Sequence, residues 1–273
     1  MKIGTYTLIK NEIDWIGPHL VSWLPYVDQM VFLDGNSTDG TLDVLMEFIK
    51  RHPDGRKIKV FANKDPKDMQ DYYVRLFNEA MSHLETDFAW FAHPDMLRIS
   101  GDFSGLGDAH AYTTTKISYA GESLKDQIYE ISEGRADRWK DVMRRNNPDL
   151  GLHYYGHYGA QNEDVYFREI TGEDHVFHGK KFDKYPYEVK DSGVVMAHFS
   201  DVRNYGRRLS RMITSLQNQG LSKADAEILA PQHPRVTLKD DIGFKFVPVG
   251  MPDCYSIPFA EYKRFMEKVE CLQ

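Results

Sequence analysis

Cysteine is scarce in this 273-residue chain, and long hydrophobic runs are missing. The two cysteines, Cys254 and Cys271, show no metal-type spacing, so we expect no disulfide framework and take a reducing compartment as the default. No run is long enough to span a bilayer, and no apolar leader of the signal-peptide type precedes the first strand-like run. These absences predict a cytoplasmic protein, while peripheral membrane contact stays open.

An excess of basic charge is also missing. The formal net charge is −7 at pH 7, and the isoelectric point is about 5.9. We expect no nucleic-acid partner, because binding to a polyanion is driven by positive surface charge. The composition, with 41% hydrophobic and 27% charged residues, is ordinary for a globular protein long enough to bury a full α/β core.

Strand-like runs and helical patterns alternate along the first part of the chain. Strand-like runs cover residues 2–8, 29–34, 57–62 and 87–93, and apolar residues at helical spacing cover 15–24, 42–49 and 72–84. This alternation predicts βαβ units and a Rossmann-like, mostly parallel central sheet with flanking helices. The rest is less regular: we expect a strand over 111–119, a helix over 133–145, a short strand over 194–199, a basic helix over 205–219 and a final helix from Phe259.

The turn after the second strand is the most informative stretch. Residues 32–41 read FLDGNSTDGT, so a buried strand ends in the carboxylate of Asp34 and a helix begins a few residues later. Ligands of open α/β sheets bind at the carboxyl ends of strands, and the free N–H groups of a helix N-terminus suit a phosphate or ribose. A simple capped βα turn is the alternative interpretation, because Asp-Gly is common in turns.

Over residues 3–97 the chain resembles the nucleotide-sugar-dependent glycosyltransferases of family 2, which have the GT-A fold. The resemblance is carried by IGTYT with KNE at 3–7 and 10–12, by the acidic turn, by Arg75 and Asn78, and by FAHPDM at 91–96, where the family has an Asp-x-Asp motif. It implies a GT-A catalytic domain over 1–200, divided into a nucleotide-binding half (1–97) and an acceptor half (98–200). A helical and irregular C-terminal extension over 201–273 would follow.

The resemblance also implies a reaction. The enzyme would transfer a sugar from a nucleoside-diphosphate donor, expected to be UDP-linked, to a hydroxyl of a glycan or another acceptor, with inversion. A divalent cation (Mn²⁺ or Mg²⁺) or a cationic clamp would hold the leaving diphosphate, where negative charge develops. Asp95 and His198 are the expected metal ligands, and His93 stands at the first acidic position of the motif. Histidine also binds manganese-like ions, although oxygen ligands suit them better.

Donor contacts are expected from residues at the ends of the first strands. Thr5 and Asp34 would contact the nucleoside, and Tyr6, Asn63 and Arg75 would complete the site. Each of the last three has a plain structural alternative: core packing for the tyrosine, a turn for the asparagine and a solvated helix face for the arginine. Three further arginines could contact phosphates or form a solvated helix face, namely Arg203, Arg207 and Arg208.

An inverting transferase needs a carboxylate base to deprotonate the acceptor hydroxyl. Glu163 and Asp164 are the first candidates, and the pair Glu173 and Asp174 is the second; either pair could instead cap a helix. Two other functions stay open. A nucleotidyltransferase would show a glycine-rich basic signature after the first strand, which TLIKNE at 7–12 lacks. A non-catalytic protein that binds a nucleotide or sugar is compatible with His93 in the acidic position.

Overall fold

The computed structural model describes residues 1–63, 76, 79–107, 111–133, 140–145, 153–155, 165–168, 174–177, 189–218, 220–240 and 244–270. Its N-terminal part alternates strands and helices as the sequence predicts. The elements are β1 (Ile3–Ile9), α1 (Ile13–Trp23), β2 (Gln29–Asp34), α2 (Thr41–Arg51), β3 (Ile58–Ala62), β4 (Phe88–Phe91) and β5 (Met96–Ser100).

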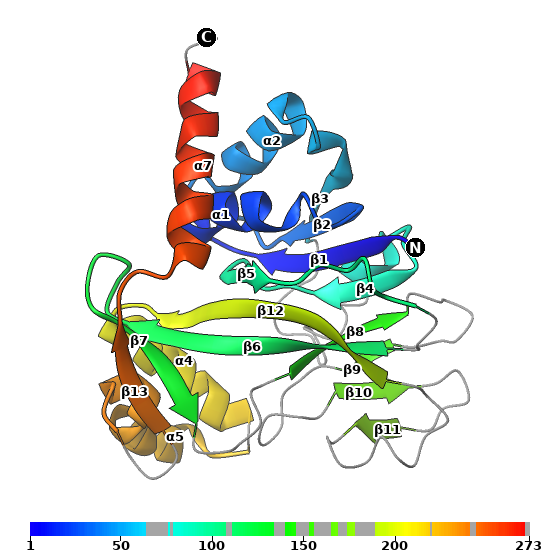
Figure 1. The fold of residues 1–273 in the computed structure, drawn as a ribbon. Coiled ribbons are helices and arrows are strands. Elements are labelled where there is room, and N and C mark those ends of the chain that lie inside the picture. Colours follow the sequence, from blue (N-terminus) through cyan, green and yellow to red (C-terminus); the bar gives the residue numbers. More distant parts are fainter. Residues whose placement is uncertain are drawn as a thin grey trace.

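These strands form the parallel centre of the main sheet. β1 pairs in parallel with β2 on one side and β4 on the other, and β3 continues beyond β2. Helices α1 and α2 cover one face (Figure 1), while Leu76, Ala80 and Leu84 pack on the opposite face against Tyr6 of β1. The predicted α/β fold with a parallel central sheet flanked by helices is therefore confirmed.

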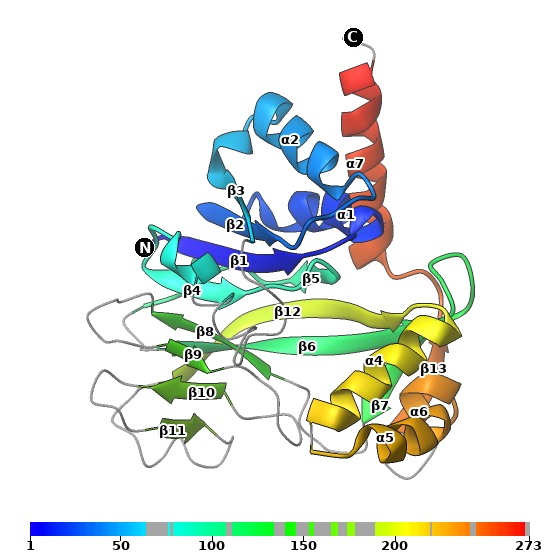
Figure 2. The same cartoon turned by 180° about the vertical axis from the view of Figure 1, so that it is seen from behind.

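The later strands extend this sheet on the β4 side. They are β6 (Ala111–Gly121), β7 (Ile128–Glu133), β8 (Lys140–Arg145), β12 (Val189–Val202) and β13 (Phe244–Val249). β8 is antiparallel to both β4 and β6, and β12 is parallel to β6, so β1, β4, β6 and β12 all run in one direction (Figures 1 and 2). Their carboxyl ends consequently meet at the same edge of the sheet.

Among the described residues, a smaller three-stranded antiparallel sheet lies beside the main sheet. It consists of β9 (His153–Tyr155), β10 (Val165–Arg168) and β11 (Asp174–Phe177), with β10 in the middle. In both views it lies at the opposite end from helices α4 (Tyr205–Asn218), α5 (Lys223–Leu229) and α6 (Pro234–Thr237) (Figures 1 and 2).

Several predicted elements in the second half differ from the structure. The helix predicted over 133–145 is wrong: Ile128–Glu133 and Lys140–Arg145 are strands that both pair with β6. Their backbone groups are satisfied by a distant partner strand, and such pairing overrides local helix propensity. The short strand predicted over 194–199 is the longer β12, and the final helix, α7 (Asp253–Glu270), begins before Phe259. The basic helix predicted near 205–219 is confirmed as α4.

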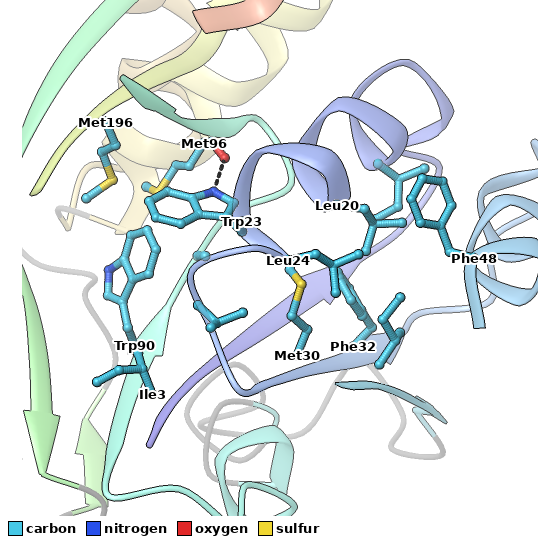
Figure 3. Close-up of a cluster of buried hydrophobic side chains, with 14 of the residues drawn as sticks. Ile3, Leu20, Trp23, Leu24, Met30, Phe32, Phe48, Trp90, Met96 and Met196 are labelled. Carbon is cyan, nitrogen blue, oxygen red and sulfur yellow. Dashed lines mark hydrogen bonds between the residues drawn. The ribbon is translucent and has the colours of Figure 1, made fainter. Parts of the chain in front are cut away.

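A cluster of large apolar side chains joins α1 to the sheet (Figure 3). Trp23 of α1 lies 4.6 Å from Trp90 of β4 between ring centroids, and its Nε1 donates a hydrogen bond of 2.9 Å to the carbonyl of Met96. His19 Nδ1 lies 3.0 Å from the same carbonyl oxygen. Buried apolar contact and these polar contacts together fix the β4–β5 turn, which carries Asp95, against α1.

The segment after residue 200 contributes both a strand and a helix to this body. β13 pairs with β7, and α7 packs against α1, where a β-carbon on Gly17 would lie 2.6 Å from the ring of Tyr262 (Figure 1). The division into two domain halves and an extension stays a prediction. Of the helices in the described ranges, none has both the length and the apolar character needed to cross a membrane.

Candidate functional site

The order of the strands reverses between β1 and β4, which is where open α/β sheets generally bind ligands. From β1 the chain moves outward to β2 and then β3, and it returns to pair β4 on the other side of β1. At such a reversal the flanking loops diverge and leave a crevice beyond the carboxyl ends of the strands. The residues that follow β1 and β4, Glu12 and His93 to Asp95, flank this position, and His198 reaches the same edge from β12.

Hydrogen bonds join the loop after β1 to the loop after β2. Asn11 has a positive φ of 57°, and its Oδ1 accepts a hydrogen bond of 2.8 Å from the backbone N–H of Thr38. The backbone N–H of Glu12 donates to Thr41 Oγ1 at 2.8 Å, and Asp39 accepts from the backbone of Thr41 at 3.0 Å. The two loops therefore support one another, and Glu12 is held at the start of α1.

Asp34 lies at the same edge and is 3% exposed. Its carboxylate accepts hydrogen bonds from the backbone N–H of Ser37 at 3.1 and 3.2 Å and from Ser37 Oγ at 2.6 Å. The Asn63 backbone N–H donates to the Asp34 carbonyl at 2.8 Å, which brings these two predicted donor contacts side by side. The geometry is that of a capped βα turn, and contact with a nucleoside stays a prediction for both residues.

The other residues predicted to contact the donor substrate are either buried in β1 or outside the described ranges. Thr5 is fully buried within β1, and Tyr6 is buried against Phe91, with ring centroids 5.5 Å apart. Core packing, the alternative for the tyrosine, is thus what the described contacts show. Of the residues named from the sequence, those outside the described ranges are Arg75, Asn78, Glu163, Asp164 and Glu173, and only the backbone of Asp174, the first residue of β11, is described.

Five charged or titratable side chains lie at the reversal point. Asp95 is 3% exposed; its Oδ1 lies 3.4 Å from His198 Nε2, and its Oδ2 lies 3.1 Å from Arg203 Nη2. The same Nη2 lies 3.9 Å from Glu12 Oε2. His93 is adjacent, with its ring centroid 5.5 Å from that of His198. The backbone N–H of Phe199 donates to the Asp95 carbonyl at 3.0 Å, so β12 is bonded directly to the turn that carries the carboxylate.

Burial and charge act differently on the two carboxyl groups. Burial alone would raise the pKa of Asp95, but the charges of His198, His93 and Arg203 and the contact with His198 hold it well below its usual range. Burial, followed by the charge of Asp95, raises the pKa of Glu12 from its ordinary 4.5 to about 7, against the opposing charge of Arg203. Asp95 is therefore a fixed negative charge, whereas Glu12 can accept or release a proton near neutral pH.

The arginines that follow β12 have separate roles. Arg203 lies in the site, and the charges of Arg207 and Arg211 on α4 also act on Glu12. Arg208 is instead buried, donating to the carbonyls of Gly121 at 2.8 Å and Val236 at 3.2 Å. Arg208 is thus structural, whereas Arg203 belongs to the charged cluster and Arg207 and Arg211 act on Glu12 through their charges.

The predicted ligands Asp95 and His198 are brought together, as the sequence analysis expected, but the described residues do not fit a complete metal site. No group of three or more His, Cys, Asp or Glu side chains within the described ranges could hold a metal ion. The carboxylate oxygen of Asp95 that points away from His198 is in contact with Arg203. Within the described residues, the cation in contact with this carboxylate oxygen is therefore the guanidinium of Arg203.

Glu12 is the residue of this cluster that was not among the predicted site residues. Its signal was present, because it ends the KNE motif that directly follows the first strand. The missing information was the fold of β12, which brings Arg203 to within 3.9 Å of it.

In comparisons with known proteins, the chain is similar to solved structures at low sequence identity. No protein-family model matches it, and no curated protein matches it. Among solved structures, it is similar to residues 1–349 of TarS from S. aureus, at 13% identity and a TM-score of 0.44, covering 89% of this chain and 76% of that one. The same TarS fragment in complex with UDP is similar at 13% identity and a TM-score of 0.43, with the same coverage of both chains.

The glycosyltransferase GlyE from Streptococcus pneumoniae is similar at 12% identity and a TM-score of 0.32, over 55% of this chain and 35% of that one. Known glycosyltransferases are therefore among the solved structures that the fold resembles. At such low identities and TM-scores the likeness carries no conclusion about activity, and the charged cluster has to be interpreted from its own geometry.

Proposed function

We propose that the chain is a nucleotide-sugar-dependent glycosyltransferase that uses a UDP-linked donor and transfers the sugar, with inversion, to a hydroxyl group of a glycan or another acceptor. The observation that supports this most is the buried Asp95, held by His198 and Arg203 at the reversal of strand order. It lies in the FAHPDM stretch, where the resembled family has its Asp-x-Asp motif. A buried carboxylate at a ligand-binding edge is costly unless it has partners, which favours a functional reason for its presence.

Three acidic residues end or follow adjacent strands at the carboxyl edge. Asp34 ends β2, Glu12 follows β1 and Asp95 follows β4, and these three strands are adjacent. With neighbouring strands about 4.8 Å apart, the distance across the three strand ends is about 10 Å. The nucleoside would lie beside Asp34 and Asn63, and the diphosphate beside Arg203. Thr5 and Tyr6 lie too deep in β1 to be assigned a donor contact from the described geometry.

The guanidinium of Arg203 suits the leaving group. Cleavage of the bond between the sugar and the diphosphate leaves negative charge on the diphosphate, and positive charge placed there beforehand stabilises the transition state more than the ground state. Because the described residues do not complete a metal site, no step of this proposal depends on a divalent cation.

The acceptor hydroxyl needs a base. Glu163 and Asp164 are proposed first and Asp174 second, as the family resemblance implies. The matched variants Glu163→Gln, Asp164→Asn and Asp174→Asn should separate them, since loss of the base lowers transfer roughly 10²–10⁴-fold and leaves donor binding intact. Wild-type transfer in all three would remove these residues from the proposal.

A panel of nucleoside-diphosphate sugars tests the function itself. The protein is incubated with each donor and with simple glycan acceptors, and the released nucleotide and the glycosylated product are quantified. Release of UDP with formation of product supports the proposal. Binding of UDP without turnover of any donor would indicate a non-catalytic binding protein, and transfer of the nucleotidyl group with release of sugar 1-phosphate would indicate a nucleotidyltransferase.

A further inference from the structure

Asp95 has a guanidinium partner on one carboxylate oxygen and faces a histidine with the other. Arg203 Nη2 contacts Oδ2 at 3.1 Å, while Oδ1 faces His198 Nε2 at 3.4 Å. Arg203 is itself fixed at its other end, where Nε donates to the carbonyl of Ser200 at 3.0 Å. Its guanidinium is thus oriented before any ligand arrives, which lowers the entropic cost of binding.

A second guanidinium is held against the first. Arg211 Nη1 donates to the same Ser200 carbonyl at 3.0 Å, so two arginines share one acceptor. Neighbouring like charges repel, and an anion placed between them removes that repulsion. Arg207 lies four residues before Arg211 on α4, so the two side chains share one face of the helix; the charge of Arg207 also acts on Glu12, and its side chain is exposed.

Arg203 and Arg211 have guanidinium N–H groups from which no described residue accepts a hydrogen bond. Within the described part of the chain, no residue accepts a hydrogen bond from Arg203 Nη1, and Ser200 is the sole acceptor of the Arg211 guanidinium. Guanidinium groups present their N–H donors in a planar fork that matches two phosphate oxygens at once. Against the three arginines stand Asp95 and Glu12, so the site holds more positive than negative charge.

We propose that Arg203, Arg211 and Arg207 form a guanidinium clamp that binds the diphosphate of the donor directly, so that nucleotide binding needs no divalent cation. This inference rests on the proposed function, because it assigns the diphosphate of that donor to these residues. Asp95 then acts as a positioning residue: it orients Arg203 toward the ligand and does not itself coordinate a metal.

Titration calorimetry with UDP tests the clamp. The protein is dialysed against EDTA and titrated with UDP, with inorganic diphosphate and with uridine, and the titrations are repeated with added Mn²⁺ or Mg²⁺. We expect UDP and inorganic diphosphate to bind in EDTA, with UDP affinity unchanged by either cation. Arg211→Gln and Arg207→Gln, both at exposed residues, should each weaken UDP roughly 10- to 100-fold, the value of one hydrogen bond between charged groups. Uridine should bind the variants and the wild type alike.

Arg51→Gln is the matched control. Arg51 is a partly buried arginine that pairs with Glu47 at 2.8 Å on α2, so its loss likewise removes one positive charge, and it removes an ion pair in addition. The Arg51→Gln variant should bind UDP as the wild type does. UDP binding that appears only with Mn²⁺ or Mg²⁺, or wild-type affinity in both α4 variants, overturns the clamp and leaves the proposed function standing. Absence of UDP binding in every condition overturns both.

Discussion

Glu12 should make the protein less stable as the pH rises toward neutrality. Its side chain is 17% exposed, and burial together with the charge of Asp95 raises its pKa from 4.5 to about 7. A carboxyl group whose pKa is raised by folding favours the folded state while it is protonated. That contribution is fully present below the unfolded pKa and is lost as the pH rises through the folded pKa. Glu12→Gln keeps the shape of the side chain and stays neutral, so it should not show this loss.

The size of the effect follows from the two pKa values. Raising the pKa of Glu12 across the interval from 4.5 to about 7, at about 1.4 kcal/mol for each pH unit, adds about 3 kcal/mol to the free energy of unfolding while Glu12 is protonated. The wild type should lose this amount across the interval, and Glu12→Gln should not. Asp95 does not interfere, because its pKa lies well below the interval. His19, whose pKa is lowered to about 4, titrates in both proteins and cancels in the comparison.

Urea unfolding of the wild type and Glu12→Gln between about pH 5 and pH 8 measures the difference. The variant should gain on the wild type as the pH rises, by about 3 kcal/mol when Glu12 is fully ionised. Glu85→Gln is the control for loss of one negative charge, because its side chain is 82% exposed, and its free energy of unfolding should stay within about 0.5 kcal/mol of the wild type. A difference between Glu12→Gln and the wild type that is constant with pH would refute the reasoning.

Three further outcomes are expected. Asp34→Asn should fold, because an amide oxygen can still accept a hydrogen bond from Ser37. It should bind UDP roughly tenfold more weakly in calorimetry, and unchanged affinity would remove Asp34 from the donor site. Gly17→Ala should lower the free energy of unfolding in urea by about 1–3 kcal/mol, since its β-carbon would lie 2.6 Å from the Tyr262 ring. Adding Tyr262→Ala should remove that overlap, and a Gly17→Ala variant as stable as the wild type would mean that α7 does not pack there. Gly101→Ala should lower the melting temperature, because its φ is +78° and the new β-carbon would collide with the Gly193 carbonyl; an unchanged melting temperature would contradict the β5–β12 geometry.

The N-terminal strands could be predicted because their signal is local. All six residues of β2 are buried, so a strand covered by helices on both faces reads as one continuous apolar run. The pattern fails for β7 and β8, whose sequences IYEISE and KDVMRR have neither a continuous apolar run nor strict alternation and which pair with β6 across the fold. Local propensity contains no information about a partner strand that is distant in sequence.

The same division applies to the candidate site. By itself, the sequence determined that carboxylates end or follow the first strands, because strand, turn and helix are encoded within a few neighbouring residues. It also indicated Asp95 and His198 as a pair, through the family resemblance. Only the tertiary structure decided that Arg203, 108 residues after Asp95, contacts this carboxylate and lies near Glu12. The reason is physical: the antiparallel pairing of β12 with β5, which sets His198 opposite Met96, brings the end of β12 to the turn that carries Asp95, and no local pattern specifies which distant strands will pair.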